Sequence, residues 1–138
     1  MNQKKSSKEL LNGDQREDEW SKVTRGERYI IRTTSQETNG VYSMLEIVAD
    51  PRNGVPMHVH DNEEEHFIVL EGKVLIANGD SRAKVGAGSS VTIGRGVPHA
   101  WCNLSEDVRL RMLVVFSPGG LEELFRQTSL KFRKRVLQ

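Results

Sequence analysis

The chain has 138 residues, with 20 Lys and Arg against 19 Asp and Glu, and only one cysteine. This length is typical of a single domain with a self-sufficient core, and the near-zero charge gives no support for nucleic-acid binding. The lone Cys102 excludes an internal disulfide and indicates a reducing compartment. The longest apolar run, Met112 to Phe116, is far shorter than the ~20 residues of a membrane helix. We therefore expect a cytoplasmic protein with neither nucleic-acid nor membrane partners.

The first part of the chain is expected to change from a polar arm to short strands. Residues 1–20 are polar and charged without helical or strand periodicity, which predicts a peripheral N-terminal arm. Residues 28–34 and 41–49 are rich in β-branched and aromatic residues, and the turn-like residues 38–40 separate them. Both segments are predicted strands, and further extended segments are expected at residues 57–60 and 65–70.

The second half continues with short strands and frequent turns. Residues 73–77 and 82–85 flank Asn78-Gly79-Asp80, which is a strong hairpin signal. Strands are also predicted at residues 90–93, 98–103 and 108–116. In the last of these every second residue from Val108 to Phe116 is apolar, so one face is expected to be buried. Many short strands without interleaved helices predict a closed or sandwiched all-β barrel.

After residues 117–120, the spacing of apolar residues changes from that of a strand to that of a helix. Leu121, Leu124 and Phe125 recur at helical spacing, and the acidic Glu122 and Glu123 suit the first turn of a helix. We expect a short helix on the barrel, followed by a basic, solvated tail at residues 131–135. The predicted organisation is an N-terminal arm (1–20), a β-barrel domain (21–117) and a C-terminal helix with the basic tail (118–138).

Three histidines and one glutamate form the candidate site. His58 and His60 lie two residues apart in a predicted strand, so their imidazoles project from the same face. Glu65 begins the next predicted strand, and His99 arrives from a later one behind Pro98, whose φ is fixed. Three neutral imidazoles and one carboxylate suit one divalent transition metal, with iron, nickel, manganese, copper, cobalt and zinc all compatible. Taken singly, each of these residues is more often structural than a ligand.

Two motifs in this region closely resemble those of the cupin superfamily. The first consists of His58-Val59-His60, Glu65 and Gly72, and the second of Gly88, Gly94-Arg95-Gly96, His99 and Asn103. The resemblance covers residues from about 41 to 116, and residues 117–122 are similar to small single-domain (cupin type 2) members of the quercetin-dioxygenase-like kind. It implies a double-stranded β-helix, or jelly-roll barrel, in which His58, His60, Glu65 and His99 bind the metal. Gly94 replaces the usual proline and the glycine before the paired histidines is displaced, but neither departure removes a ligand.

The neighbours of these ligands are assigned other roles. The spacing to Gly72 selects Glu65 as the ligand carboxylate, with Glu64 as the second choice. Strand alternation then sends His66 to the opposite face, where surface or interface packing is the expected role. Cys102 has no activating partner and is expected to be structural. Seven further residues are candidates for lining the cavity, although large inward side chains more often belong to the core: Tyr42, Met44, Phe67, Trp101, Asn103, Met112 and Phe116.

The first functional hypothesis is an oxygenase-type enzyme, in which a small enol, catechol or flavonol-like molecule binds the metal through a deprotonated oxygen. Glu65 is the candidate catalytic residue, because it can accept the substrate proton as well as anchor the metal. Two alternatives use the same ligands: a non-catalytic small-ligand-binding or sensor protein, and a metal-assisted isomerase or lyase. The family resemblance also implies a homodimer.

Overall fold

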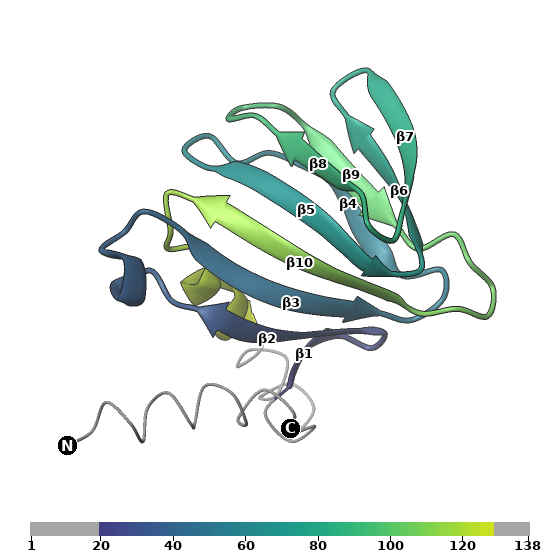
Figure 1. Cartoon of the computed structure of the whole chain (residues 1–138), viewed down its shortest axis with the longest axis horizontal. Helices are drawn as coiled ribbons and strands as arrows, with labels where there is room; N and C mark the ends of the chain where they lie inside the picture. Colours follow the sequence, from purple (N-terminus) through teal and green to yellow (C-terminus); the bar gives the residue numbers. More distant parts are fainter. Residues whose placement is uncertain (1–19, 129–138) are drawn as a thin grey trace.

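The computed structural model describes residues 20–128, which form two antiparallel β-sheets arranged as a jelly roll (Figure 1). The larger sheet has the order β1 (Ser21–Thr24), β2 (Glu27–Thr33), β3 (Ser43–Ala49), β10 (Leu110–Ser117), β5 (Glu64–Glu71) and β8 (Ser90–Ile93). The smaller sheet has the order β4 (Gly54–His58), β9 (His99–Cys102), β6 (Lys73–Asn78) and β7 (Ser81–Gly86). A short 3₁₀ helix, η3 (Gln36–Thr38), lies between β2 and β3. The fold is therefore the expected all-β jelly roll.

Strand β10 shows how the residue pattern builds the larger sheet. Its side chains alternate between the core and the outer face, and the inward residues Leu110, Met112, Val114 and Phe116 are each at most 1% exposed. β10 pairs with β3 on one side and with β5 on the other. A central strand with one buried face is what alternating apolar residues favour. The hairpin predicted around Gly79 is also confirmed, because β6 pairs with β7 from end to end.

The hydrophobic core fills the space between the sheets. The larger sheet contributes Tyr29, Leu45, Ile47, Phe67, Val69 and the inward residues of β10, and the smaller sheet contributes Val74, Ile76, Val85 and Trp101. A glycine is needed where β4 approaches β9, because a Cβ atom at Gly54 would collide with the carbonyl oxygen of Trp101. β4 and β9 pair from Gly54 opposite Cys102 to His58 opposite His99, with an irregularity between Val55 and His58.

Three strand boundaries differ from the sequence prediction. β1 was not expected, since its four residues carry no hydrophobic run, and it forms by pairing with β2. The strand expected at residues 57–60 instead spans Gly54–His58, because its pairing with β9 starts at Gly54. β10 begins at Leu110, so Val108, expected on the buried face, is 45% exposed.

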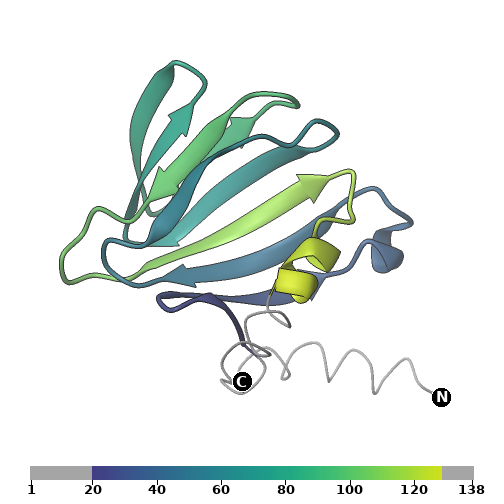
Figure 2. The same cartoon turned by 180° about the vertical axis from the view of Figure 1, so that it is seen from behind.

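A short helix at residues 122–128 follows the barrel as expected, and Figure 2 shows it beside the sheets. The Phe125 ring packs edge-on against Tyr29 with 5.3 Å between ring centroids, and it lies 6.2 Å from the Phe116 ring. Glu122 is buried and accepts hydrogen bonds from the backbone N–H groups of Ser35 (2.6 Å) and Gly120 (2.9 Å). The helix is therefore held against the inner face of the larger sheet.

The expected N-terminal arm, apart from Trp20, and the basic tail lie outside the described residues. Within residues 20–128, no helix has both the length and the apolar character that a membrane crossing requires.

Candidate metal centre

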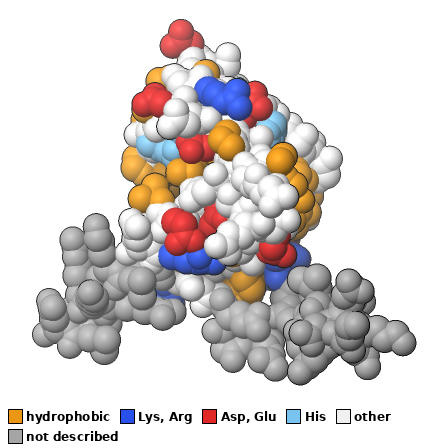
Figure 3. All heavy atoms as spheres, turned by 90° about the vertical axis from the view of Figure 1, so that its left-hand side faces the viewer, with side chains coloured by type: hydrophobic (Ala, Val, Ile, Leu, Met, Phe, Trp, Pro, Cys, Tyr) orange, Lys and Arg blue, Asp and Glu red, His pale blue; other side chains and the backbone are white. Residues whose placement is uncertain are grey.

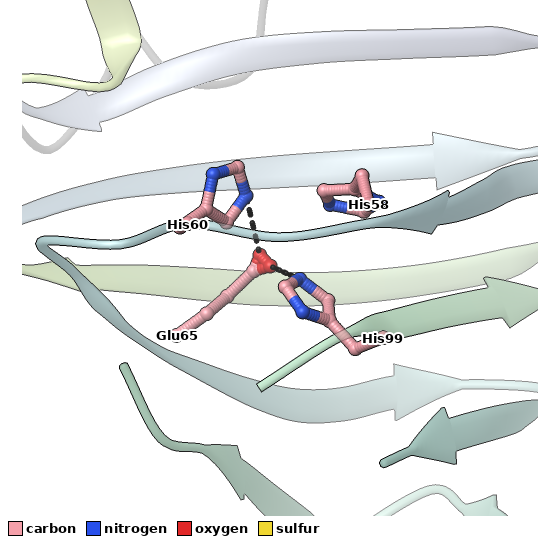
Figure 4. Close-up of side chains that lie close together, drawn as sticks. All are labelled: His58, His60, Glu65 and His99. Atoms are coloured by element: carbon pink, nitrogen blue, oxygen red, sulfur yellow. Dashed lines mark hydrogen bonds and ion pairs between the residues drawn. The ribbon is translucent and has the colours of Figure 1, made fainter. Parts of the chain in front are cut away.

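Four side chains from different parts of the barrel converge on one point (Figure 4). His58 is the last residue of β4, His60 follows it, Glu65 is the second residue of β5, and His99 opens β9. One ligand atom from each residue can be chosen so that all four atoms lie within 4.8 Å of one another. The structure thus brings together the four residues that the sequence predicts as ligands, in a spacing that could hold one metal ion.

The convergence of the two paired histidines has a different cause from the one expected. His58 and His60 do not share a strand face, because β4 ends at His58 and its pairing with β9 is irregular between Val55 and His58. The segment after β4 nevertheless brings His60 back to the site. The centroid of its ring lies 4.8 Å from that of His58 and 5.2 Å from that of His99. The two imidazoles therefore meet because the chain leaves the strand after His58, and not because alternation along a strand places them on one face.

Backbone carbonyls orient two of the imidazoles. His58 Nδ1 lies 2.8 Å from the carbonyl oxygen of Pro56, and His99 Nδ1 lies 2.9 Å from that of Val97. A neutral histidine that donates its Nδ1 hydrogen to a carbonyl keeps the lone pair on Nε2 for a metal. The backbone on either side of the site thus selects the tautomer that a metal ligand requires.

Glu65 connects the histidines through its two oxygens. Its Oε1 lies 3.2 Å from His99 Nε2, and its Oε2 lies 4.0 Å from His60 Nε2. The Glu65 and His99 side chains are almost fully buried, whereas the His60 side chain retains 17% exposure. Histidine side chains also reach the surface among hydrophobic and acidic ones on the face shown in Figure 3. The site therefore combines a buried carboxylate–imidazole pair with a side closer to solvent.

Electrostatic interactions shift the pKa values of His60 and His99 in opposite directions. Burial lowers the pKa of His60, and the nearby His58 and His99 add to this effect, so the neutral imidazole is favoured although Glu65 opposes the change. Burial also acts to lower the pKa of His99, but its hydrogen bonds with Glu65 and the Val97 carbonyl outweigh burial, and its pKa is raised. Metal binding requires deprotonated ligands. Glu65 thus favours the protonated form of His99, and a metal ion would have to displace that proton to bind at Nε2.

The donor set contains three nitrogens and one oxygen and no sulfur. Cys102 does not join it, since its Sγ lies 3.9 Å from the backbone oxygen of Arg52. Imidazole and carboxylate donors fit a divalent transition metal of borderline softness. His66 lies on the opposite face of β5 from Glu65, with its Nδ1 3.0 Å from Thr92 Oγ1 and its Nε2 3.9 Å from a Glu64 carboxylate oxygen. The residues present thus fit a metal ion, and the two neighbours set aside on sequence grounds lie elsewhere.

A mainly apolar cavity of about 190 Å³ adjoins this group. Besides His58, His60 and Glu65, it is lined by Val23, Glu27, Ile47, Val55, Phe67, Trp101, Val114, Phe116, Leu124, Phe125 and Thr128. Three of the seven predicted lining residues, Phe67, Trp101 and Phe116, are among them. The C-terminal helix supplies part of the wall, which the sequence did not indicate.

The other four predicted lining residues are not part of this wall. Met44 lies on the outer face of β3, since it alternates with the buried Ser43 and Leu45, and Tyr42 precedes the strand and is 37% exposed. Met112 is fully buried in the core. Asn103 is also fully buried, and its amide donates hydrogen bonds to the carbonyl oxygens of Ala49 (3.1 Å) and Val108 (3.0 Å). The side chain of Asn103 therefore ties the end of β3 to the segment that precedes β10.

A buried acidic residue on the cavity wall was missed. Glu27 opens β2 and is 1% exposed, with its side chain on the cavity wall. Strand alternation could have predicted its inward position, because Glu27 lies two residues before the core residue Tyr29 in the same strand. Its acidic side chain, however, favours an exposed position from sequence alone.

A jelly roll that brings three histidines and one glutamate together defines a β-barrel protein with a candidate metal site. Residues 45–116 match the model of the Cupin domain family, which spans more than half of the chain. The chain therefore belongs to the cupin superfamily, as the two motifs indicated.

Individual proteins resemble the chain to different degrees in sequence and in fold. An uncharacterised protein of Streptomyces coelicolor is 42% identical over 56 residues, which cover 41% of this chain and 51% of that protein. The match thus spans about half the length of this curated relative. The structure of KdgF from a Halomonas species has a TM-score of 0.68 at 15% identity, covering 80% of this chain and 94% of KdgF. A predicted oxalate decarboxylase of Thermotoga maritima has a TM-score of 0.64 at 19% identity, covering 72% and 90%. These structural likenesses show the fold.

Proposed function

We propose that this chain is a metal-dependent, oxygenase-type cupin of the quercetin-dioxygenase-like kind, acting on a small enol, catechol or flavonol-like molecule. The observation that carries the proposal is the grouping of three imidazoles and one carboxylate, of which His58, His60 and Glu65 lie on the wall of an otherwise mainly apolar cavity. A divalent transition metal bound by these side chains would supply Lewis acidity and, with dioxygen, oxidation chemistry. The chain itself has to position the substrate, exclude water and handle a proton.

We assign the acceptance of the substrate proton to Glu65. Its carboxylate is buried beside His99 and faces His60 with its second oxygen, so it can hold a metal and also accept a proton from an enol or phenol hydroxyl. His58 and His99 are held in place by backbone carbonyls and would keep the geometry during this transfer.

The cavity walls favour an apolar substrate body. Phe67, Trp101 and Phe116 provide aromatic surface, which can enclose a planar ring and exclude water. None of the described residues that line the cavity is Lys or Arg. A small dianion such as oxalate, or a sugar phosphate, would therefore find no cationic side chain on the wall. This distinguishes our proposal from the reaction suggested by the name of the Thermotoga maritima protein.

Oxygen consumption tests the proposal. The purified full chain is loaded under anaerobic conditions with iron, nickel, manganese, cobalt, copper or zinc, and dioxygen uptake is then measured with catechol, 1,3-diketone, flavonol and oxalate panels. We expect uptake with at least one metal and one of the first three panels. His99→Ala should abolish it, whereas the matched variant His66→Ala should retain it, because His66 lies on the opposite face of β5 from Glu65.

Other outcomes would select a different function. Tight ligand binding without uptake would favour a non-catalytic binding or sensor protein. Conversion of a substrate without uptake would favour isomerase or lyase chemistry. Failure to retain any transition metal would refute the proposal altogether.

A further inference from the structure

Glu27 is a buried acid with one carboxyl oxygen that finds no hydrogen-bond partner among the described residues. It is 1% exposed, and its Oε2 atom is buried with no hydrogen-bond partner in the described part of the chain. The side chain lines the same cavity as His58, His60 and Glu65. Leaving a buried polar group unpaired costs about 1–3 kcal/mol, so such groups are rare and call for an explanation.

The other buried acids of the described residues all have partners. Glu46 is bonded to Arg32 and Arg111 on the outer face of the larger sheet. Glu122 accepts hydrogen bonds from two backbone N–H groups, and Glu65 lies against His99. Each of these acids is explained by a structural contact or by the metal centre, and Glu27 by neither.

Glu27 and Glu65 lie at opposite ends of the inner face of the larger sheet. β2 and β5 are three strand positions apart, which corresponds to about 14 Å across the sheet. They are also displaced along the strands, since Glu27 pairs with Ala49 at one end of β3, whereas Phe116, the partner of Glu65, pairs with Ser43 at the other. A ligand anchored at the metal centre would therefore extend its far end toward Glu27.

We propose that Glu27 is a specificity-determining residue that accepts a hydrogen bond from a hydroxyl group at the end of the substrate remote from its metal-binding oxygens. This inference rests on the proposed function, because it assumes that the other end of the substrate is held at the metal centre. It narrows the substrate class to molecules with a chelating oxygen pair at one end, an apolar body and a hydroxyl at the opposite end.

A hydroxyl is the partner that best fits the surroundings of Glu27. The neighbouring wall residues are apolar, including Val23, Ile47 and Val55. Burial raises the pKa of Glu27 to about 7. The carboxyl group is thus held as readily neutral as ionised at that pH, and either form has an oxygen that accepts a hydrogen bond. A cationic amine, in contrast, would give up more hydration than a hydroxyl on entering this mainly apolar cavity.

A matched pair of probes tests this inference. 3-Hydroxyflavone and 3,4′-dihydroxyflavone share the chelating hydroxyketone and differ by one hydroxyl at the far end of the molecule. Their dissociation constants are measured by fluorescence titration against the zinc-loaded full chain under argon, where no oxidation occurs, and against the metal-free chain. We expect zinc to strengthen the binding of both flavones. We also expect the dihydroxy compound to bind at least about tenfold more tightly, since hydrogen bonds to ionisable groups in buried sites are of that strength.

Two variants assign the preference to one side chain. Glu27→Leu should remove it, and because an unpaired buried acid is replaced by an apolar group, the variant is expected to fold. Thr128→Val is the control, since Thr128 also lines the cavity but its hydroxyl already donates to the Leu124 carbonyl oxygen (2.9 Å). This variant should retain the preference.

The outcomes separate the two proposals. Equal affinities for two flavones that both need zinc would overturn the role of Glu27 and leave the metal-binding function standing. A tenfold preference that persists in Glu27→Leu would overturn it as well. No binding of either flavone to the zinc-loaded chain would count against the proposed function and therefore also against this inference.

Discussion

Glu27→Gln tests the energetic consequence of burying an unpaired carboxyl group. Burial raises the pKa of Glu27 from 4.5 to about 7, and no charged neighbour contributes to this change. At a pH between these two pKa values, Glu27 therefore keeps its proton in the folded chain but has lost it in the unfolded chain. Stability must fall as the pH rises through this interval, because the folded state holds more protons than the unfolded state. Glutamine has nearly the same shape and does not titrate.

The magnitude follows from the two pKa values. The interval from 4.5 to about 7, at roughly 1.4 kcal/mol per pH unit, amounts to about 3 kcal/mol. The advantage of Glu27→Gln over the parent chain should therefore be about 3 kcal/mol larger at pH 8 than at pH 4.5. Solvent screens this difference in the free energy of unfolding very little, since the Glu27 side chain is almost completely buried.

Urea denaturation in the presence of EDTA measures this difference, with tryptophan fluorescence as the signal and one experiment at each pH from 4.5 to 8. The slope of the free energy of unfolding against urea should be the same for both chains, so that the midpoints report stability. Glu106→Gln is the control, because the Glu106 side chain is 77% exposed and forms only a surface ion pair with Arg52. A pH-independent difference between Glu27→Gln and the parent would refute the reasoning, since it would mean that Glu27 is paired or solvated in the folded chain.

Three further predictions concern the metal centre and the supports of the barrel. His99→Ala should reduce metal content at least tenfold, measured by elemental analysis after reconstitution, while His66→Ala leaves it unchanged; equal losses would mean that the ligand set is misassigned. Asn103→Ala removes two donated hydrogen bonds and one accepted from the Ser105 N–H, and should cost about 3 kcal/mol in urea denaturation. The exposed Asn62→Ala should cost less than about 0.5 kcal/mol. Glu122→Ala deprives the N–H groups of Ser35 and Gly120 of their acceptor and should lower the melting temperature by several degrees, an effect that a solvated Glu122 would not produce.

The candidate ligands could be predicted because motif spacing carries most of the information. His58, His60, Glu65 and His99 are each close to a strand end, and short strands of a jelly roll bring their ends together regardless of small errors in boundaries. This is why the ligand set is brought together although His60 lies beyond β4. The opposite placement of His66 was also predictable, since alternation along β5 depends only on local backbone geometry.

The cavity wall was harder to predict. Alternation along the strands correctly placed Phe67 and Phe116 on the inner face of the sheet. It cannot distinguish a residue of the cavity wall from a core residue such as Met112, because both face inward. The contribution of Phe125 depends on how the C-terminal helix docks on Tyr29, which no local pattern encodes.

The sequence by itself determined the alternation of the strands, the turns between them and the four-residue set that can bind a metal, because all three depend on spacing along the chain. Only the tertiary structure decided what surrounds that set. It buried Glu27 on the cavity wall with one unpaired carboxyl oxygen and bonded Asn103 to the carbonyl oxygens of Ala49 and Val108, since burial and hydrogen-bond partners are set by segments far apart in sequence. An acidic residue at a strand start has the same local pattern whether it faces water or a ligand, and only the packing of the sheets distinguishes the two.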